Sequence, residues 1–355
     1  MTDTPGLPFA GPVPKRPAGE ITALDAGSPL LREPVVITGA SELMSEVWRW
    51  TPDRLRELIG DEKLDATLPG PDGTFAYEPG RALASRPLPV ARFFDDMADP
   101  DGPRWCLQQV AVRDRLPVLA ERLDYPSCVP PELINAVNLW MAAPGTVTPL
   151  HYDDTHNLFA QVSGSKTFYL FPPENLEALY PGPLNTGAQH LSRVDLFQPD
   201  LERHPRTGSL AYRSATVQAG EALLLPAFWW HQVASHDVAV SVNFWWRAHV
   251  LDVLCPGFMR QLQSTAVQED LGALAGTFEL GGDDPVSGAA ELLALLADIG
   301  ESRAADALAR SVLRTAERRA PADARAGALL ARYPEPDPRL VSDTVAYLSE
   351  GAFSW

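Results

Sequence analysis

The sequence predicts a mainly β protein, a barrel or jelly roll, with helices flanking it. Short runs of aromatic and β-branched residues, separated by Gly, Pro and Asn turns, fill the region from Arg104 to Arg247, as is typical of strands. No helical pattern separates these runs, which favours a barrel or jelly roll over an α/β fold. After about residue 250 the composition becomes rich in Ala and Leu. The expected strands are 105–112, 134–142, 158–162, 166–171, 215–218, 222–225 and 239–247.

The region before the barrel begins with an arm, residues 1–30, that contains six prolines and is therefore expected to be extended or flexible. Residues 33–38 (EPVVIT) then predict a short strand. Thr51 followed by Pro52 indicates the start of a helix, with Thr51 as N-cap, and Gly60 is expected to end it.

The region after the barrel, residues 251–355, predicts a helical segment. Two stretches, 289–299 and 301–319, are rich in Ala and Leu, and the second places its apolar residues on one helical face. Its last turn carries arginines, which suit the negative end of a helix dipole. We expect these helices to pack against the barrel or against a second copy of the chain, which would make the protein a homodimer.

Composition and charge exclude several classes of protein. Hydrophobic residues make up 45% of the 355 residues and charged residues 21%, which separates the chain from disordered proteins. Lys and Arg number 29 and Asp and Glu number 46, a net charge of −17 with no basic patch to offset it, so we expect neither nucleic acid nor a membrane as partner. The N-terminus lacks a signal-peptide pattern and no apolar run reaches 18 residues, which predicts a cytoplasmic protein. The cysteines are odd in number and widely spaced, which argues against a disulfide framework or a thiolate zinc site: Cys106, Cys128 and Cys255.

A metal site is predicted at His151 and Asp153. Their spacing of two places both side chains on one face at the end of a strand. A distant histidine would complete the two-His, one-carboxylate triad that binds ferrous iron and leaves positions open. His231, which follows the run GEALLLPAFWW, is the preferred third ligand. By itself an H-x-D triplet is often a solvated surface pair, and the competing third ligands are His156, His190, His204, His236 and His249.

A buried cation is predicted at Lys166. It lies in the strand KTFYLF, whose other residues are mostly apolar, so an inward Lys there needs an anion to offset its desolvation. A carboxylate ligand would meet that need, and Thr148 could donate a hydrogen bond to the same carboxylate. The alternatives are a lysine whose ammonium reaches water at the barrel mouth and a threonine that serves a turn before Pro149.

The stretches Asn138 to Pro173 and Gly220 to Arg247 resemble the Jumonji C, cupin-like 2-oxoglutarate oxygenases. The shared motifs are T-x-x-H-x-D-x-x-x-N, Q-V-x-G-x-K, LFPP, RVDLFQPD and WWH followed by VNFWW, all in order. Within that family they are nearest to the asparaginyl hydroxylase branch, factor inhibiting hypoxia-inducible factor. The resemblance implies a double-stranded β-helix over residues 31–250 that binds Fe(II) and 2-oxoglutarate, with O2 as the second cosubstrate.

The resemblance also implies roles for single residues. His151, Asp153 and His231 match the iron ligands, Lys166 and Thr148 match the residues that hold the distal carboxylate of 2-oxoglutarate, and Asn157 and Asn243 match residues near the metal. Cys106 stands where the family has a tyrosine that bonds the distal carboxylate, and a thiol is the weaker donor. His190 and Leu191 stand at the pair that clamps the target asparagine, so asparagine specificity does not carry over. Gln108 and Trp230 complete the expected substrate residues. Trp229, Trp245 and Trp246 could also wall the cavity, although at least half of these four tryptophans are expected to be core residues.

These observations predict an Fe(II)- and 2-oxoglutarate-dependent dioxygenase that hydroxylates an amino-acid side chain of a peptide or protein. One alternative is a hydroxylase of a small molecule or a carrier-bound amino acid. Another, from a different class, is a non-catalytic cupin that binds a metal, although such a scaffold would not need residues matching Lys166, Thr148, Asn157 and Asn243.

Overall fold

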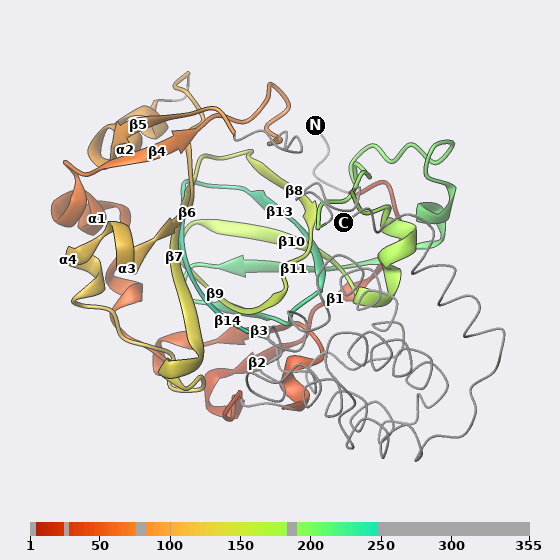
Figure 1. The fold of residues 1–355 in the computed structure, drawn as a ribbon, viewed down its shortest axis with the longest axis horizontal. Helices are drawn as coiled ribbons and strands as arrows, with labels where there is room; N and C mark the ends of the chain where they lie inside the picture. The colour runs from red at the N-terminus through yellow and green to blue at the C-terminus, as the bar shows by residue number, and fades with distance from the viewer. Residues whose placement is uncertain (1–4, 25–27, 76–82, 100, 183–189, 248–355) are drawn as a thin grey trace, which may run out of the picture. The chain divides into compact units, whose positions relative to one another are not determined.

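The computed structural model describes residues 5–24, 28–75, 83–99, 101–182 and 190–247. They form two sheets that curve around a common interior (Figure 1). The five-stranded sheet has the order β1 (Phe9–Pro12), β11 (Tyr212–Gln218), β10 (Ser165–Phe171), β13 (Trp230–Ser235) and β8 (Val147–His151). The nine-stranded sheet has the order β2 (Lys15–Pro17), β3 (Val35–Thr38), β12 (Ala222–Leu225), β9 (Thr155–Ser163), β14 (Ala239–Arg247), β7 (Ile134–Ala142), β6 (Cys106–Ala111), β4 (Lys63–Thr67) and β5 (Ser85–Pro89).

Short helices lie outside the sheets, mainly in the first half of the chain (Figure 1). The α-helices are α1 (Pro52–Ile59), α2 (Val90–Ala98), α3 (Val112–Arg115) and α4 (Pro117–Ala120). The 3-10 turns are η1 (Ala18–Glu20), η2 (Pro29–Leu31), η3 (Ala40–Glu42), η4 (Val47–Arg49), η5 (Pro131–Leu133), η6 (Pro173–Leu179) and η7 (Pro205–Ser209). Within the described ranges, no helix is both long and apolar enough to cross a membrane.

The jelly-roll architecture predicted from the sequence is confirmed, and most predicted elements lie where the patterns placed them. Strands β7, β12 and β14 have the predicted bounds, and α1 begins after Thr51, whose hydroxyl accepts the backbone N–H of Arg54. The sequence did not predict β13, because its residues WHQVAS mix polar and apolar side chains without a clear alternation. That strand carries His231 into the interior of the barrel.

The described part of the N-terminal arm is extended, which is one of the two predicted alternatives, and it is paired into the sheets. Strand β1 pairs in parallel with β11, and β2 pairs in parallel with β3, so the described part of the arm extends both sheets. Leu7 and Val13 are buried. The prolines that suggested flexibility are compatible with these strands, because a strand at a sheet edge does not need every backbone N–H. The predicted helical segment 251–355, and with it the predicted dimer interface, lies outside the described residues.

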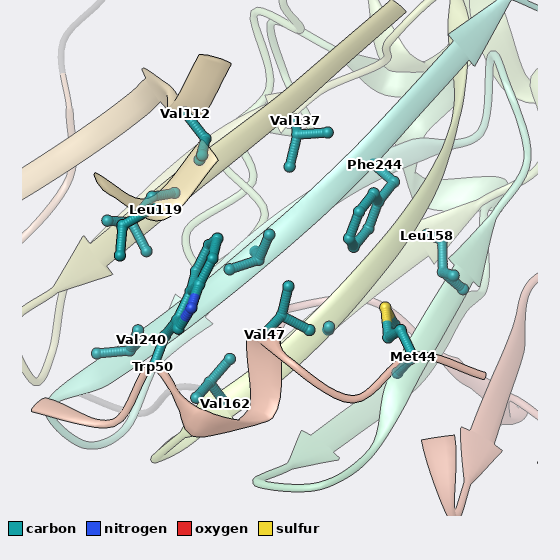
Figure 2. Close-up of a cluster of buried hydrophobic side chains, with 14 of the residues drawn as sticks. Met44, Val47, Trp50, Val112, Leu119, Val137, Leu158, Val162, Val240 and Phe244 are labelled. Carbon is teal, nitrogen blue, oxygen red and sulfur yellow. The ribbon is translucent and has the colours of Figure 1, made fainter. Parts of the chain in front are cut away.

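Two hydrophobic clusters occupy the two faces of the nine-stranded sheet. The outer face packs against the first half of the chain: Figure 2 shows Met44, Val47 and Trp50 against residues of β9 and β14 such as Leu158 and Phe244. The inner face belongs to the barrel interior, where Phe159, Phe168, Leu170, Leu223 and Leu225 cluster. Alternation along each strand produces this division, because successive side chains point to opposite faces.

Truncation of Phe244 tests the role of the outer core. Phe244 is fully buried beneath the N-terminal segments, so Phe244→Ala is expected to lower the free energy of unfolding by about 3 to 5 kcal/mol. Phe9, which is 56% exposed, is the matched control, and Phe9→Ala should cost less than about 1 kcal/mol. Urea denaturation of both variants measures the difference, and equal losses would contradict this view of the core.

Candidate active site

The pairing of β8 with β13 brings two histidines face to face inside the barrel. His151 lies opposite His231 in the register, and their ring centroids are 4.1 Å apart. Asp153 follows β8, and its Oδ2 lies 3.8 Å from His231 Nε2. One ligand atom from each of these three residues lies within 4.8 Å of the others, a separation suited to a shared metal ion.

A bulge in β8 adds Thr148 to the same wall. The register advances from His231 opposite His151 to Val233 opposite Thr148, so β8 has one more residue than β13 in this interval. In a regular strand two residues three apart point to opposite faces, but the extra residue at Pro149 or Leu150 turns both Thr148 and His151 toward the cavity. Proline suits this position because an irregular ladder does not require its N–H.

Backbone carbonyls orient both imidazoles. His151 Nδ1 donates to the carbonyl of Pro149 at 2.7 Å, and His231 Nδ1 donates to the carbonyl of Trp229 at 2.9 Å. With the proton on Nδ1, each Nε2 keeps its lone pair for a metal ion. The carbonyl of Asp153 accepts the N–H of Phe228, which ties the loop after β8 to the loop before β13.

Burial shifts the pKa of each member of this trio toward its neutral form. Removal from water lowers the pKa of His151 to about 4, with a further contribution from His231, and it also lowers the pKa of His231 to about 4. The same loss of hydration raises the pKa of Asp153. Two neutral imidazoles therefore face a carboxyl group that lacks a cationic partner. A divalent cation bound among them would supply that partner and keep the carboxylate ionised.

One cavity extends from this trio into the barrel. It is lined by Gln109, Trp140, Thr148, His151, Asp153, Asn157, Phe159, Lys166, Phe168, His190, Leu191, His231, Val233, Asn243 and Trp245. The sequence assigned eight residues to iron and 2-oxoglutarate, and seven of them line this one cavity. The eighth, Cys106, does not. The seven come from β8, β9, β10, β13 and β14 and from the loop after β8, which carries Asp153.

Lys166 provides a cation in the cavity wall. Its side chain is buried, and Nζ donates to Ser241 Oγ at 3.2 Å and lies 5.3 Å from the centre of the Phe159 ring. Burial lowers the pKa of Lys166 to about 8. Among the described residues, no carboxylate forms an ion pair with it. This is the electrostatic setting expected of a site for a bound carboxylate.

Two asparagines line the cavity that the lysine and the metal trio share. Asn243 Oδ1 accepts the indole N–H of Trp140 at 3.1 Å. Asn157 is buried, and its Oδ1 has no hydrogen-bond partner. The indole N–H of Trp245, which also lines the cavity, is likewise buried and unpaired. Unpaired polar atoms around a cavity indicate that a polar ligand completes their hydrogen bonds.

The cavity lining also includes His190 and Leu191, which a short segment holds beside the end of β8. The N–H of Tyr152 donates to the carbonyl of His190, and the N–H of Ser192 donates to the carbonyl of Leu150. These bonds bracket the bridge between His151 and Leu191. Burial lowers the pKa of His190, which is half-buried. Both residues therefore line the cavity beside the metal trio, and their contact with a substrate stays a prediction.

Three predicted site residues do not line the cavity. Cys106 lies in a separate apolar cluster with Ala142 and Ala239, and burial raises the pKa of its thiol. Trp230 is fully buried and packs edge-on against Tyr152 at 4.8 Å between centroids. Gln108 is replaced in the wall by Gln109, because a bulge in β6 gives Gln109 a left-handed backbone (φ 49°).

Sequence reasoning missed Gln109 and Trp140. Nothing in the run WCLQQVAV indicates a bulge, since neither glutamine is a residue that favours a positive φ. Trp140 could have been found from alternation along β7, because Leu139 and Met141 point to the outer core and leave Trp140 for the inner face. Of the competing third ligands, His156 accepts the N–H of Ala227, and His204 and His236 are absent from the lining; His249 is outside the described residues.

A family model described as a cupin-like domain matches residues 29–251, more than half of the chain. The chain belongs to the cupin-like domain family. This cupin-like protein is 27% identical over 220 residues to lysine-specific demethylase 8 of Xenopus tropicalis, a match that covers 61% of this chain and 48% of that protein. It is 36% identical over 137 residues to Jumonji C domain-containing protein 5 of Drosophila melanogaster, covering 37% of this chain and 34% of the relative. It is 28% identical over 244 residues to the human bifunctional peptidase and (3S)-lysyl hydroxylase JMJD7, covering 60% of this chain and 77% of the relative.

These matches confirm the predicted resemblance to Jumonji C proteins. The nearer likeness to an asparaginyl hydroxylase stays a prediction. The matched part of this cupin-like protein spans about half or less of the length of the demethylase and the fly protein.

Removal of the Asp153 carboxylate tests the metal site. Asp153→Ala is expected to weaken binding of Fe(II) more than about a hundredfold, because even outer-shell partners of a metal ligand contribute up to that factor. Asp154→Ala is the matched control, since that carboxylate is adjacent but exposed. Calorimetric titration with Fe(II) under nitrogen, and with Zn(II), measures both. Full metal occupancy in Asp153→Ala would reject this ligand set.

Acidification tests the histidine environment. The pKa values of His151 and His231 are depressed to about 4, so between that value and the unfolded value of about 6.5 the unfolded chain binds more protons than the folded chain. The melting temperature of the metal-free protein should therefore fall as the pH drops from about 6.5 to 4, although the raised pKa of Asp153 acts in the opposite sense. The double variant His151→Asn/His231→Asn should lose this component. An unchanged pH dependence in that variant would mean that these imidazoles are not the acid-sensitive groups.

Proposed function

We propose that the protein is an Fe(II)- and 2-oxoglutarate-dependent oxygenase that hydroxylates an amino-acid side chain of a peptide or protein. One observation carries the proposal. Lys166, which is buried and forms no ion pair with a carboxylate of the described residues, lines the same cavity as the trio His151, Asp153 and His231. A metal trio alone would suit many cupins. A trio that shares its cavity with a lysine ammonium that has no anionic partner suits a metal-chelating oxo-acid.

The donor set fits ferrous iron. Two neutral imidazoles and one carboxylate form the ligand set of non-haem Fe(II) oxygenases, and they leave coordination positions free for a cosubstrate. When bound together, Fe(II), 2-oxoglutarate and O2 supply the oxidising power that inserts an oxygen atom into a C–H bond.

The residues of the chain have binding and orienting roles in this proposal. His151, Asp153 and His231 hold the metal, and the carbonyls of Pro149 and Trp229 fix the two imidazoles. Lys166, with Thr148, holds the distal carboxylate of the oxo-acid. The walls keep water from the reacting groups. His190 and Leu191 lie beside the metal ligands, where a substrate side chain would enter, and Gln109, Trp140 and Trp245 extend that lining.

The names of the relatives suggest a finer proposal for the substrate. One relative is named a (3S)-lysyl hydroxylase and another a lysine-specific demethylase. A lysyl side chain is therefore the first candidate here. The indole rings of Trp140 and Trp245 suit a cationic chain, because aromatic faces attract ammonium groups. Cytoplasmic location and a homodimer remain part of the proposal.

Turnover assays test the proposed reaction. Protein loaded with Fe(II) should convert 2-oxoglutarate to succinate and add one oxygen atom to a lysine-containing peptide, detected by mass spectrometry. Succinate release with a small amino acid but not with any peptide would favour the small-molecule alternative. Iron binding without binding of 2-oxoglutarate would favour the non-catalytic cupin.

Two substitutions test the division between cosubstrate and substrate residues. Lys166→Ala should raise the 2-oxoglutarate concentration for half-maximal succinate release by about ten- to a hundredfold, because it removes a charge-assisted hydrogen bond. Leu191→Gln should leave that concentration nearly unchanged and alter which peptide reacts. Equal effects of the two substitutions on the 2-oxoglutarate requirement would mean that the two regions have been misassigned.

A further inference from the structure

Alternate residues of β14 form the inner wall of the barrel in successive layers. Ala239, Ser241, Asn243 and Trp245 point inward, since Val240, Val242 and Phe244 belong to the outer core. Ser241 lies opposite Trp140 of β7, and Ala239 lies opposite Ala142. The layer that contains Ser241 thus separates the Asn243 layer from the Ala239 layer.

The Ala239 layer closes the barrel next to the lysine. Phe75, Cys106, Ala142 and Ala239 form a buried apolar cluster there. Phe75 is tied in place because its N–H donates to the carbonyl of Val147. Gly73, two residues before Phe75, has φ +86°, and a Cβ at that position would lie 2.1 Å from the carbonyl oxygen of Gly145. Residues 73 and 145 therefore approach each other at a distance that only glycine permits, and this close packing holds Phe75 in the apolar cluster.

Because this neighbouring cluster is apolar, Lys166 has one hydrogen-bond partner in the protein, the hydroxyl of Ser241. The buried thiol of Cys106 has a raised pKa and so provides no negative charge at neutral pH. Of the three N–H donors on the ammonium, one is directed to Ser241 Oγ at 3.2 Å. Among the described residues, Nζ forms no other hydrogen bond and no ion pair. The other donors are therefore available to a ligand.

We propose that Ser241 is a positioning residue for anion binding: it holds the Lys166 ammonium in the orientation that presents its remaining donors to the distal carboxylate of 2-oxoglutarate. The inference rests on the proposed function. A lysine has a flexible four-carbon stem, and fixing its head group in advance lowers the entropy lost on binding. Ser241 is fully buried and so is well suited to fix it.

The first test is direct binding of the cosubstrate. Ser241→Ala should weaken binding of 2-oxoglutarate by about tenfold, the range of one hydrogen bond to a charged group. Binding is followed by the intrinsic tryptophan fluorescence, to which Trp140 and Trp245 in the cavity lining contribute, as 2-oxoglutarate is titrated into Fe(II)-loaded protein under nitrogen, which needs no turnover. Thr167→Val is the matched control. It removes a hydroxyl from the neighbour of Lys166, but on the outer face of β10, where that hydroxyl bonds His236 and Thr216. The control should bind within about twofold of the original chain.

A double-mutant cycle separates positioning from a general structural effect. If Ser241 acts through Lys166, then Ser241→Ala should have almost no further effect on 2-oxoglutarate binding in a Lys166→Ala background. Independent, additive losses would overturn the proposal, and so would unchanged binding by Ser241→Ala alone. Should the alanine variant fail to fold, Ser241→Cys keeps nearly the same volume with a much weaker acceptor and replaces it in the cycle.

Failure of this inference can be distinguished from failure of the proposed function. If the unaltered protein binds Fe(II) but not 2-oxoglutarate, the proposed function is wrong and the inference falls with it. If the unaltered protein binds 2-oxoglutarate and Lys166→Ala weakens that binding, but Ser241→Ala does not, only the role of Ser241 is rejected. Metal affinity should be the same in all of these variants, since among the described residues no hydrogen bond or ion pair joins Ser241 or Lys166 to the metal trio.

Discussion

The antiparallel pairing of β8 with β13 is the constraint on which the site depends. It places His151 opposite His231, and the bulge at Pro149 and Leu150 turns Thr148 toward the same cavity. A regular ladder would bring only one of the two β8 residues inward, because side chains alternate between faces. The edge of β8 that faces away from β13 is also bonded at both ends, to residues 73–75 and to residues 190–192. The strand that carries His151, a candidate metal ligand, is therefore held from both sides.

Burial of charge is the second constraint, and the two ends of the cavity meet it in different ways. At the metal trio, desolvation drives the imidazoles and the carboxyl toward neutral forms, and a divalent cation would reverse the shift of the carboxyl. At Lys166, desolvation lowers the pKa to about 8, which leaves most of the ammonium charged at neutral pH. A dianion that chelates the metal with one end and reaches the ammonium with the other would satisfy both ends at once.

The outer elements give the barrel the rigidity that such a site needs. The first half of the chain covers the outer face of the nine-stranded sheet with an apolar cluster (Figure 2), so the strands that carry Asn157 and Asn243 are packed on both faces. The N-terminal arm contributes β1 and β2 to the two sheets. Positioning residues on strands packed in this way holds them more precisely than placement on loops would.

The sequence by itself determined the jelly-roll class, most strand positions, and the residue types of the metal trio with its lysine. Those features depend on local patterns: alternation along strands, an H-x-D triplet, and a lysine in an apolar run. Only the tertiary structure decided which residues share the cavity. It selected His231 over the other histidines through the register of β13, and it replaced Gln108 with Gln109 through a bulge. The tertiary structure also buries Trp230 in the core, and it places Cys106 in the apolar cluster with Phe75, Ala142 and Ala239 rather than in the cavity wall. Register and bulges arise from contacts between strands far apart in the chain, and a shift of one residue exchanges the inward and outward faces, so no local pattern could fix them.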